Sequence, residues 1–523
     1  MIEEQHEEDK NELPSSISKK KNIKSKPSHF STVIEHIFPN NDHSSINLDR
    51  TDASLIMFFL GISALTRTIR IYYPKNVIYN ESIYGTYLNN YLQGIFFIDN
   101  NPPFPTLLIS SIAYFAGYRG KYAFQEEEVY SSMFYVMLRL IPAFFSTFCI
   151  PISYLIMRII GVCHLGASCA AFMICSDLIL IVEGRHFMID GIVHFFSVLS
   201  ILSIFLYERL ETFIALLFEG ICLGLAASSK ITTSGIILLA LFRQFPLKDV
   251  KNKRFLRNSG PSIIRCLILL QIIFTLYYLF YSIHVTILPF KDENLNNNSM
   301  IPDQIKKSLF LIDDYTKKKL IDDPLWSISS FDSIRSLSNI DWHKIRKNSP
   351  SHFSRVISLI FHNHKLNVKS SQFNSPWWTW AICLGKYVPI WNEEDGHQIG
   401  CVCNVFLWIP VFVGILCTFI ISIFQCDFVS QRSEMMIGYF LSYLPFAFVP
   451  CNFSASYYLI PLFFGVFNLV LIIDDICNKK ASGFIYMMLI HFSISGYFMW
   501  SPLSYGKHVG DINFLIWKKW MTK

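Results

Sequence analysis

The sequence predicts an all-α polytopic membrane protein, and three observations lead to this prediction. Hydrophobic residues make up 52% of the 523 residues, charged residues make up only 16%, and the mean hydropathy is +0.36. An average soluble domain carries about 25% charged residues. The apolar residues also gather in runs long enough to cross a bilayer. This composition excludes a disordered chain, a small disulfide-rich secreted protein and an ordinary cytosolic enzyme.

Eleven apolar runs are the expected transmembrane helices, because each has the length and hydropathy of a crossing or nearly so. They lie at about 53–72, 134–161, 163–182, 187–207, 212–228, 231–243, 262–286, 402–425, 434–450, 455–475 and 481–500. The two at 212–228 and 231–243 are short enough to form one tight hairpin. The run at 104–118 is short for a crossing, and we predict that it forms an interfacial helix on the lumenal face.

The distribution of basic residues predicts the orientation in the membrane. Residues 1–52 are polar and Lys-rich, and we expect a disordered cytosolic tail. The segment 243–257 after the sixth span is rich in Lys and Arg, and Lys479 and Lys480 follow the tenth span. Basic loops favour the cytosolic side, and both positions have the parity that a cytosolic N-terminus requires. The C-terminus is then lumenal.

This orientation divides the rest of the chain into three parts. A membrane region at 53–290 contains the lumenal loop 73–133. A second lumenal loop, 291–375, is charged and shows no strand alternation or hairpin signal, so we assign no domain to it. The last part, 376–523, is a second membrane region with a short lumenal tail.

Composition gives no sign of nucleic acid or of a metal. The net charge is only +6, and the basic residues follow the pattern of membrane orientation. The 13 cysteines form no CxxC pair and have no Cys/His spacing typical of zinc. Many of them lie inside apolar runs, where cysteine behaves as a small hydrophobic residue. We therefore expect neither a metal site nor a nucleic-acid partner.

Two carboxylates stand out in the first lumenal loop. Glu81 lies shortly after the first span, and Asp99 precedes Pro102 and Pro103, which impose an extended entry into the next helix. A carboxylate at a lumenal membrane surface can accept a proton from a hydroxyl. It can equally cap a helix or pair with Arg67, and the residues alone leave these roles open.

Several ionisable residues lie near membrane depth, where an unpaired charge is costly. Arg139 opens the second span, Arg185 and Asp190 flank the start of the fourth, and Lys230 separates the two short spans. Together they could form a cationic pocket for an anionic lipid phosphate, because a partly dry site strengthens the attraction of Arg and Lys for phosphate oxygens. The alternatives are snorkelling to the interface and pairing between helices.

An ordered series of segments runs through most of 53–515. The first two are YPKNVIYNESIYGTY and FFIDNNPPFPTLLISSIAYFAGYRG in the first lumenal loop, followed by YVMLRLIPAFFSTFCIPISY, EGRHFMIDGIVHFF and GICLGLAASSK. Beyond the sixth span come SPWWTW, YLPFAFVPCNFSASYYLIPL and SPLSYG. The series resembles the protein O-mannosyltransferases, which use dolichyl-phosphate-mannose and have the GT-C glycosyltransferase fold. Its order is more specific than any single motif.

The resemblance implies a GT-C-like fold with about eleven transmembrane helices and lumenal interfacial helices. It also implies that mannose passes, with inversion, from dolichyl-phosphate-mannose to Ser or Thr hydroxyls of acceptor polypeptides at the lumenal face of the endoplasmic reticulum membrane. One carboxylate acts as general base, and no cofactor or metal is expected. Because members of this family often pair with paralogues, a second mannosyltransferase subunit is a further expected partner.

The resemblance implies that nine residues of this chain correspond to the family's site residues, and they fall into three groups. The catalytic group consists of Glu81, Asn80 and Asp99. The group that would bind the donor phosphate consists of Arg139, Arg185 and Lys230. The further positions of the site are Arg67, Asn101 and Asp190.

This chain departs from the family's pattern at the catalytic pair. The family's Asp, usually assigned as the base, is Asn80 here, and an amide cannot take a proton from a hydroxyl. The His of the family's HPP motif is Asn101, and the loop 291–375 is too short for the family's MIR domain. Two hypotheses follow. Either Glu81 replaces the missing base in an active transferase, which we favour, or the chain is catalytically impaired and serves as a partner subunit.

Overall fold

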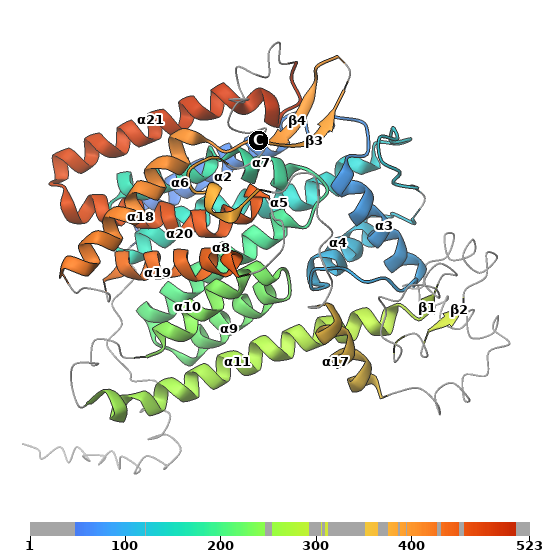
Figure 1. The fold of residues 1–523 in the computed structure, drawn as a ribbon, viewed down its shortest axis with the longest axis horizontal. Helices are drawn as coiled ribbons and strands as arrows, with labels where there is room; N and C mark the ends of the chain where they lie inside the picture. The colour runs from blue at the N-terminus through green and yellow to red at the C-terminus, as the bar shows by residue number, and fades with distance from the viewer. Residues whose placement is uncertain are drawn as a thin grey trace, which may run out of the picture.

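The structure is a computed structural model of an α-helical bundle (Figure 1). It describes residues 48–120, 122–245, 254–291, 305, 309–311, 351–363, 375–384, 387–393, 395–425, 430–448 and 454–508. The long helices lie side by side, and two shorter helices and a β-hairpin gather at one end of the bundle. Most of the loop expected at 291–375, and nearly all of the tail expected at 1–52, lie outside the described residues.

A helix, or a pair of helices, occupies each of the eleven expected spans. They are α2 (Arg50–Thr68), α5 (Phe134–Ile160), α6 (His164–Cys175) with α7 (Leu178–Arg185), α8 (Asp190–Leu210), α9 (Phe213–Ala227), α10 (Ser234–Arg243), α11 (Arg254–Ile287), α18 (Val405–Gln425), α19 (Gln431–Tyr443), α20 (Leu459–Ile476) and α21 (Lys479–Ser504). Among the described residues, six helices are long and apolar enough to cross a membrane, and the bent pair α6–α7 would make a seventh. The all-α membrane class is therefore confirmed, while eleven crossings stay a prediction.

The third expected span consists of two helices instead of one. α6 and α7 meet with a bend of 60° at Ser176 and Asp177. The carboxylate of Asp177 caps α7 by accepting a hydrogen bond from the Leu180 amide at 2.8 Å. It also accepts one from the indole Nε1 of Trp408 at 2.7 Å. A buried cap therefore breaks the helix at a point where the apolar pattern of the sequence continues.

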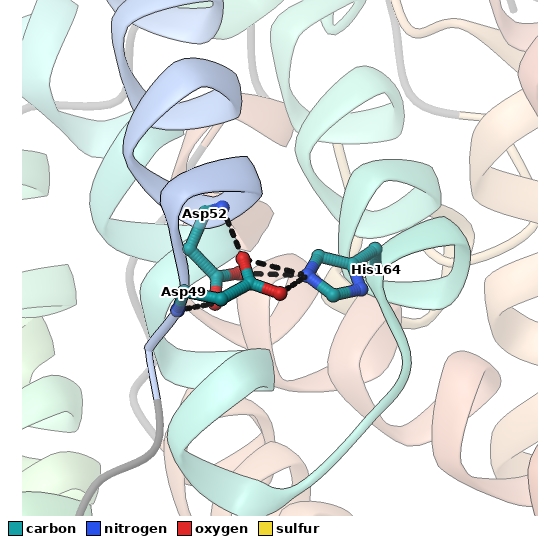
Figure 2. A group of neighbouring side chains, drawn as sticks. All are labelled: Asp49, Asp52 and His164. Atoms are coloured by element: carbon teal, nitrogen blue, oxygen red, sulfur yellow. Dashed lines mark hydrogen bonds and ion pairs between the residues drawn. The ribbon is translucent and has the colours of Figure 1, made fainter.

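A capping box makes the first helix begin at Arg50, slightly earlier than expected. The side chains of Asp49 and Asp52 each accept a hydrogen bond from the other's backbone amide. Figure 2 shows His164 pointing at both carboxylates, with Nε2 at 3.3 Å from Asp49 and 3.5 Å from Asp52. Arg158 adds an ion pair to Asp52 at 2.6 Å. These contacts fasten the start of α2 to α5 and α6.

The bundle has a buried centre and an exposed periphery. Of the most apolar 18-residue stretch within 455–476, the segment that contains α20, 83% is buried inside the protein. For the corresponding stretch of α11, within 260–287, the buried share is only 17%. α20 therefore packs among other helices, and α11, which lies along one edge in Figure 1, presents most of its apolar surface outward. An outward apolar surface on a helix of this length is typical of contact with lipid.

A close approach between α5 and α8 fixes the start of α8. A Cβ atom on Gly191 would lie 2.6 Å from the Pro142 carbonyl oxygen, so only glycine fits there without a shift. Because Asp190 is the first residue of α8, this contact sets the position of the Asp190 carboxylate.

The end of the bundle that is expected to be lumenal carries the remaining elements. They are α3 (Tyr79–Gln93), α4 (Phe104–Phe115), α17 (His352–Asn363), the parallel pair β1 (Phe290–Lys291) and β2 (Phe310–Leu311), and the antiparallel pair β3 (Val388–Asn392) and β4 (Gln398–Cys401). The run at 104–118, expected as a short interfacial helix, does contain a helix, α4. Its depth relative to a bilayer stays a prediction.

Candidate functional site

A buried ion pair joins α3 to α5. Glu81, in the first turn of α3, and Arg139, in the second turn of α5, are both fully buried. The guanidinium donates from Nε to Oε1 at 2.6 Å and from Nη2 to Oε2 at 2.8 Å. The carboxylate also accepts hydrogen bonds from the Tyr130 hydroxyl at 3.1 Å and the Phe187 amide at 3.1 Å. Both Glu81 oxygens are therefore occupied by protein donors. The pairing of Glu81 with Arg67, left open by the sequence, is replaced by pairing with Arg139.

The remaining donors of Arg139 hold the chain that leads into α3. Nη1 donates to the carbonyl oxygens of Ile71 and Pro74 at 3.2 and 2.7 Å, and Nη2 donates to that of Asn76 at 3.3 Å. All five N–H groups of the guanidinium thus have protein acceptors. A donor phosphate would have to displace one of them, so the phosphate role of Arg139 stays a prediction that this geometry does not support.

Asn80 precedes Glu81 but faces a different neighbour. Its Nδ2 donates to the sulfur of Met188 at 3.0 Å. The side chain is partly buried, and the amide has no group that can take up a proton.

Asp99 lies in the turn between α3 and α4 and is only 6% exposed. Its Oδ1 accepts hydrogen bonds from the Asn101 amide at 3.0 Å and from the Asn101 side chain at 3.4 Å. Its Oδ2 is buried and has no hydrogen-bond partner among the residues that the structure describes. Burial raises the pKa of the Asp99 carboxyl to about 7, and the bonds from Asn101 and the charge of Lys230 oppose the rise.

Lys230 stands at the break between α9 and α10, where the backbone is extended before a short 3₁₀ turn, η1 (Ile231–Thr233). Its ammonium lies 2.8 Å from Oδ1 of Asp190 and 4.2 Å from the centre of the Tyr457 ring. Because three N–H donors are available and one is used by Asp190, the ammonium retains donors for a further acceptor.

One backbone contact brings the Asp99 turn next to Lys230. The Phe104 amide, at the start of α4, donates to the Ser228 carbonyl at the end of α9 at 3.3 Å. Tyr84 of α3 lies within electrostatic reach of both Asp99 and Asp190. The structure therefore assembles Asp99, Asn101, Asp190 and Lys230 into one site.

Glu183 and His194 form a second pair of interacting side chains, next to Asp190. The Glu183 carboxylate lies 2.8 Å from His194 Nε2, and both side chains are buried. Ligand atoms of Glu183, Asp190 and His194 lie within 4.8 Å of one another, a spacing that a metal ion could use. The ammonium of Lys230 already places a positive charge on Asp190.

Arg185 and Arg67 form a separate, cationic part of the same end of the bundle. Arg185 donates to the carbonyls of Ser504 at 3.0 Å and Ile69 at 2.6 Å, and it lies 4.4 Å from the centre of the Tyr505 ring. Arg67 donates to the hydroxyls of Ser146 and Thr66. Both are buried, and in each one guanidinium nitrogen has no hydrogen-bond partner within the described ranges. Within the part of the chain that the structure describes, neither forms an ion pair.

Sequence reasoning missed two residues that complete these groups. His194 lies four residues after Asp190, so the two share a face of α8, and this spacing could have indicated it. Tyr130 reaches Glu81 from a loop 49 residues away, and nothing in the sequence pattern signals that contact.

Comparison with known proteins confirms the resemblance noted in the sequence. Residues 57–289 match the family "Dolichyl-phosphate-mannose-protein mannosyltransferase". The chain is 26% identical over 245 residues to protein O-mannosyl-transferase 1 of Danio rerio, covering 45% of this chain and 34% of that protein. It is 28% identical over 220 residues to dolichyl-phosphate-mannose–protein mannosyltransferase 3 of Saccharomyces cerevisiae, covering 40% and 29%. The matched part thus spans about a third of the length of these curated relatives.

A solved structure shares the fold over nearly the whole chain. It is the S. cerevisiae protein O-mannosyltransferase Pmt1–Pmt2 complex bound to the sugar donor, with a TM-score of 0.72 and 16% sequence identity. The superposition covers 88% of this chain and 91% of that chain. The predicted fold class is therefore confirmed beyond the segment that the family match covers.

Proposed function

We propose that this chain, a relative of the protein O-mannosyltransferases, transfers mannose from dolichyl-phosphate-mannose to Ser or Thr hydroxyls of proteins, with inversion at the sugar. The relationship of residues 57–289 to that family supports the reaction type. The observation that carries the proposal is the Asp99 carboxylate, whose Oδ2 accepts no hydrogen bond from the described residues and which lies within electrostatic range of the Lys230 ammonium. The site then offers a proton acceptor and a cation for the donor phosphate in one place.

In this mechanism Asp99 is the general base. Its free Oδ2 takes the proton of the acceptor hydroxyl while the hydroxyl oxygen attacks the anomeric carbon of mannose. The bond from that carbon to the phosphate oxygen breaks, and dolichyl phosphate leaves with the electron pair. A pKa of about 7 suits this role, because about half of the carboxyl groups are deprotonated near neutral pH and the carboxylate is still basic enough to accept a proton.

Lys230 binds the donor phosphate and stabilises the negative charge that grows on it. Asp190 holds the ammonium at 2.8 Å and the Tyr457 ring covers it at 4.2 Å, so its position is fixed before the substrate arrives. Arg185 and Arg67 are a second cationic group at the same end of the bundle, and both are buried. The carboxylate and these cations supply the chemistry, and the proposal assigns no cofactor or metal to it.

Glu81 and Arg139 are positioning residues in this proposal. Their ion pair and the three carbonyl contacts of Arg139 fix the segment that enters α3. This assignment moves the role of base from Glu81, which the sequence favoured, to Asp99.

The proposed location is the endoplasmic reticulum membrane. The apolar helices support a multi-pass membrane protein. A cytosolic N-terminus and a lumenal C-terminus are the orientation that places Asp99 and Lys230 on the side of secreted acceptor proteins.

The test is transfer of labelled mannose from dolichyl-phosphate-mannose to a Ser/Thr peptide, by membranes that contain this chain and lack related transferases. The matched control is the same peptide with Ala at every Ser and Thr. Transfer to the first peptide alone supports the proposal, and equal counts on both peptides contradict it.

The second candidate is a partner subunit without its own catalysis, and Asn80 is the observation that favours it. The Pmt1–Pmt2 neighbour is described as a complex, which makes a paralogous subunit a reasonable partner. This alternative predicts no transfer by the chain alone, together with loss of a partner's transfer when the chain is removed.

A further inference from the structure

The helix α17 lies in the second of the expected lumenal loops, to which the sequence assigned no domain, and it packs across α11 (Figure 1). His352 Nε2 and the Ser282 hydroxyl of α11 form a hydrogen bond of 2.7 Å. Val356 and Leu359 are buried and belong to the same hydrophobic cluster as Tyr281 of α11. One side of α17 is therefore fixed to α11 near the C-terminal end of that helix.

A second side of α17 is apolar and partly exposed. Phe353, Ile357, Ile360 and Phe361 follow the i, i+4, i+7, i+8 spacing that places residues on one side of a helix. Phe353 is 61% exposed and Phe361 is 66% exposed. The third side carries polar residues, which are Ser354, Arg355 and Ser358. An exposed aromatic side next to a polar side is typical of a helix that lies at a membrane surface.

The exposed side of α17 continues the outward apolar surface of α11. The ring centre of Phe353 lies 5.9 Å from that of Tyr278, and the Tyr278 ring centre lies 6.4 Å from that of Phe274. On α11, Phe274 is 52% exposed and Leu279 is 45% exposed. The aromatic rings thus join α17 to a surface that is itself typical of contact with lipid.

The length of α11 gives the depth of α17 relative to a bilayer. The 28 residues of the apolar stretch 260–287 extend about 42 Å, whereas a hydrocarbon core is about 30 Å thick. With the stretch centred in the core, Ser282 lies at the boundary of the core and Tyr278 lies about 7 Å inside it. Because α17 begins with its contacts to these two residues, it begins where acyl chains meet headgroups.

We propose that α17 is an interfacial helix, with Phe353 and Phe361 inserted between the phospholipid acyl chains of the leaflet at this end of the bundle. The polar side, with Arg355, then faces the headgroups. This inference goes beyond the proposed function, since it depends on the crossing of the membrane by α11 and not on the transfer reaction.

The insertion sets the depth of the candidate site in the membrane. Phe96 and Phe97 belong to the same hydrophobic cluster as Val356 and Leu359, and Asp99 follows them closely in the chain. A single packed cluster therefore connects the inserted helix to the turn that carries Asp99.

The experiment measures which quencher reaches α17 in the full chain, reconstituted in phosphatidylcholine vesicles. Phe353→Cys and Phe361→Cys are each labelled with an environment-sensitive fluorophore, in a chain whose exposed Cys163 and Cys417 are replaced by Ala. Quenching by brominated acyl chains is compared with quenching by iodide present on both sides of the membrane. The chain without the introduced thiol gives the background to subtract. We expect both labels to lose most of their fluorescence in brominated vesicles and little of it to iodide.

Three further labelled positions provide the controls. Phe274→Cys on α11 is the reference for contact with lipid, and Glu126→Cys, at an exposed position of another loop, is the reference for water. Ser358→Cys lies on the polar side of α17, so its ratio of bromine to iodide quenching should be lower than that of Phe361→Cys. Equal ratios at these two positions would contradict an insertion by one side of the helix.

Two other results would overturn the proposal. Strong quenching by iodide at Phe353→Cys and Phe361→Cys would place α17 in water. Weak quenching by both reagents would show that another segment of the chain or a second subunit covers this side. Because the transfer assay is not involved, either result leaves the proposed function as it stands.

A second measurement uses the unchanged chain and needs no substitution. The vesicles contain a phosphatidylcholine with a photoactivatable diazirine on its acyl chain, and the digest is analysed by mass spectrometry after illumination. We expect cross-linked lipid on the peptide that contains Phe353 and Phe361, as on the peptide that contains Phe274. Lipid on the α11 peptide together with none on the α17 peptide would contradict the insertion.

Discussion

Glu81 and Asp99 are two buried carboxylates of the same loop, 73–133, and they differ in what surrounds them. Both carboxylate oxygens of Glu81 accept hydrogen bonds, which come from Arg139, the Tyr130 hydroxyl and the Phe187 amide. No described residue donates a hydrogen bond to the Oδ2 of Asp99, and burial raises the pKa of this carboxyl to about 7. The lone pairs of Glu81 are used by protein donors, whereas one oxygen of the buried Asp99 accepts no hydrogen bond within the described part of the chain. Availability of the lone pairs, more than place in a motif, separates a catalytic carboxylate from a structural one.

The largest expected effect on the transfer rate comes from removing the charge of Asp99. Asp99→Asn should lower the rate of mannosyl transfer by about 10²–10⁴-fold, the usual contribution of a general base. The measurement is initial rate per folded molecule in the peptide assay. Asp395→Asn, the same change at an exposed position, should leave the rate unchanged. A rate for Asp99→Asn close to that of the unchanged chain would remove Asp99 from the mechanism.

The matching change at Glu81 should act on stability. Glu81→Gln leaves the buried guanidinium of Arg139 without its counter-charge, and breaking such a pair typically costs about 3–5 kcal/mol. We expect lower yield of folded protein and an earlier loss of monodisperse protein on heating in detergent.

Two further variants sharpen that result. Glu126→Gln, at an exposed position of the same loop, should melt like the unchanged chain. The double change Glu81→Gln with Arg139→Gln should recover part of the stability, because neither charge is then left alone. A Glu81→Gln protein that is stable but inactive would instead make Glu81 the base.

The pH dependence of transfer tests the same contrast without a substitution. Asp99 must be deprotonated to accept a proton, and its folded pKa is about 7, so the rate should rise with pH and reach half its plateau near pH 7. Below about pH 6 the rate should fall roughly tenfold per pH unit. Measurement of kcat/KM between pH 5.5 and 8.5 in saturating donor gives the profile. The groups that face Asp99 are Asn101, Lys230, Tyr84, Tyr87 and Tyr91.

A profile that is flat across this range would contradict the assignment, because no base of pKa near 7 would then limit the rate.

The smallest expected effect comes from restoring the family's acid at Asn80. If Asp99 is the base, Asn80→Asp should change the rate little, because a competent proton acceptor is already present. A sharp gain would show that the site lacks a base at position 80, and it would favour the partner-subunit hypothesis for the unchanged chain. Asn76→Asp, in the same segment, controls for added negative charge.

Much of the fold could be predicted from the sequence, because a transmembrane helix must be a long apolar run. The apolar runs of the sequence predicted where the helices of the bundle lie along the chain. The break between α6 and α7 could not be predicted, since it depends on Asp177 meeting Trp408, which lies 231 residues further along the chain. The early start of α2 follows from a local capping box, which was present in the sequence at Asp49 and Asp52.

The site was predicted less completely than the fold. Family resemblance marked Asp99, Asp190 and Lys230, and the structure pairs Lys230 with Asp190 and places Asp99 within electrostatic range of Lys230. It also marked Glu81 and Arg139, but their mutual pairing arises from tertiary packing of two helices and leaves no trace in local pattern. Charge type can be read from sequence, whereas the number of partners that satisfy a charge cannot.

The brevity of α9 and α10 has a consequence for the lipid around the protein. With 15 and 10 residues they measure about 22 and 15 Å, less than the roughly 30 Å of a bilayer's hydrocarbon core. Where they face lipid, hydrophobic mismatch should thin the leaflets and draw headgroups downward toward the break that carries Lys230. An isoprenoid substrate could then diffuse sideways into the site with its phosphate already at the depth of the ammonium, without being lifted out of the membrane.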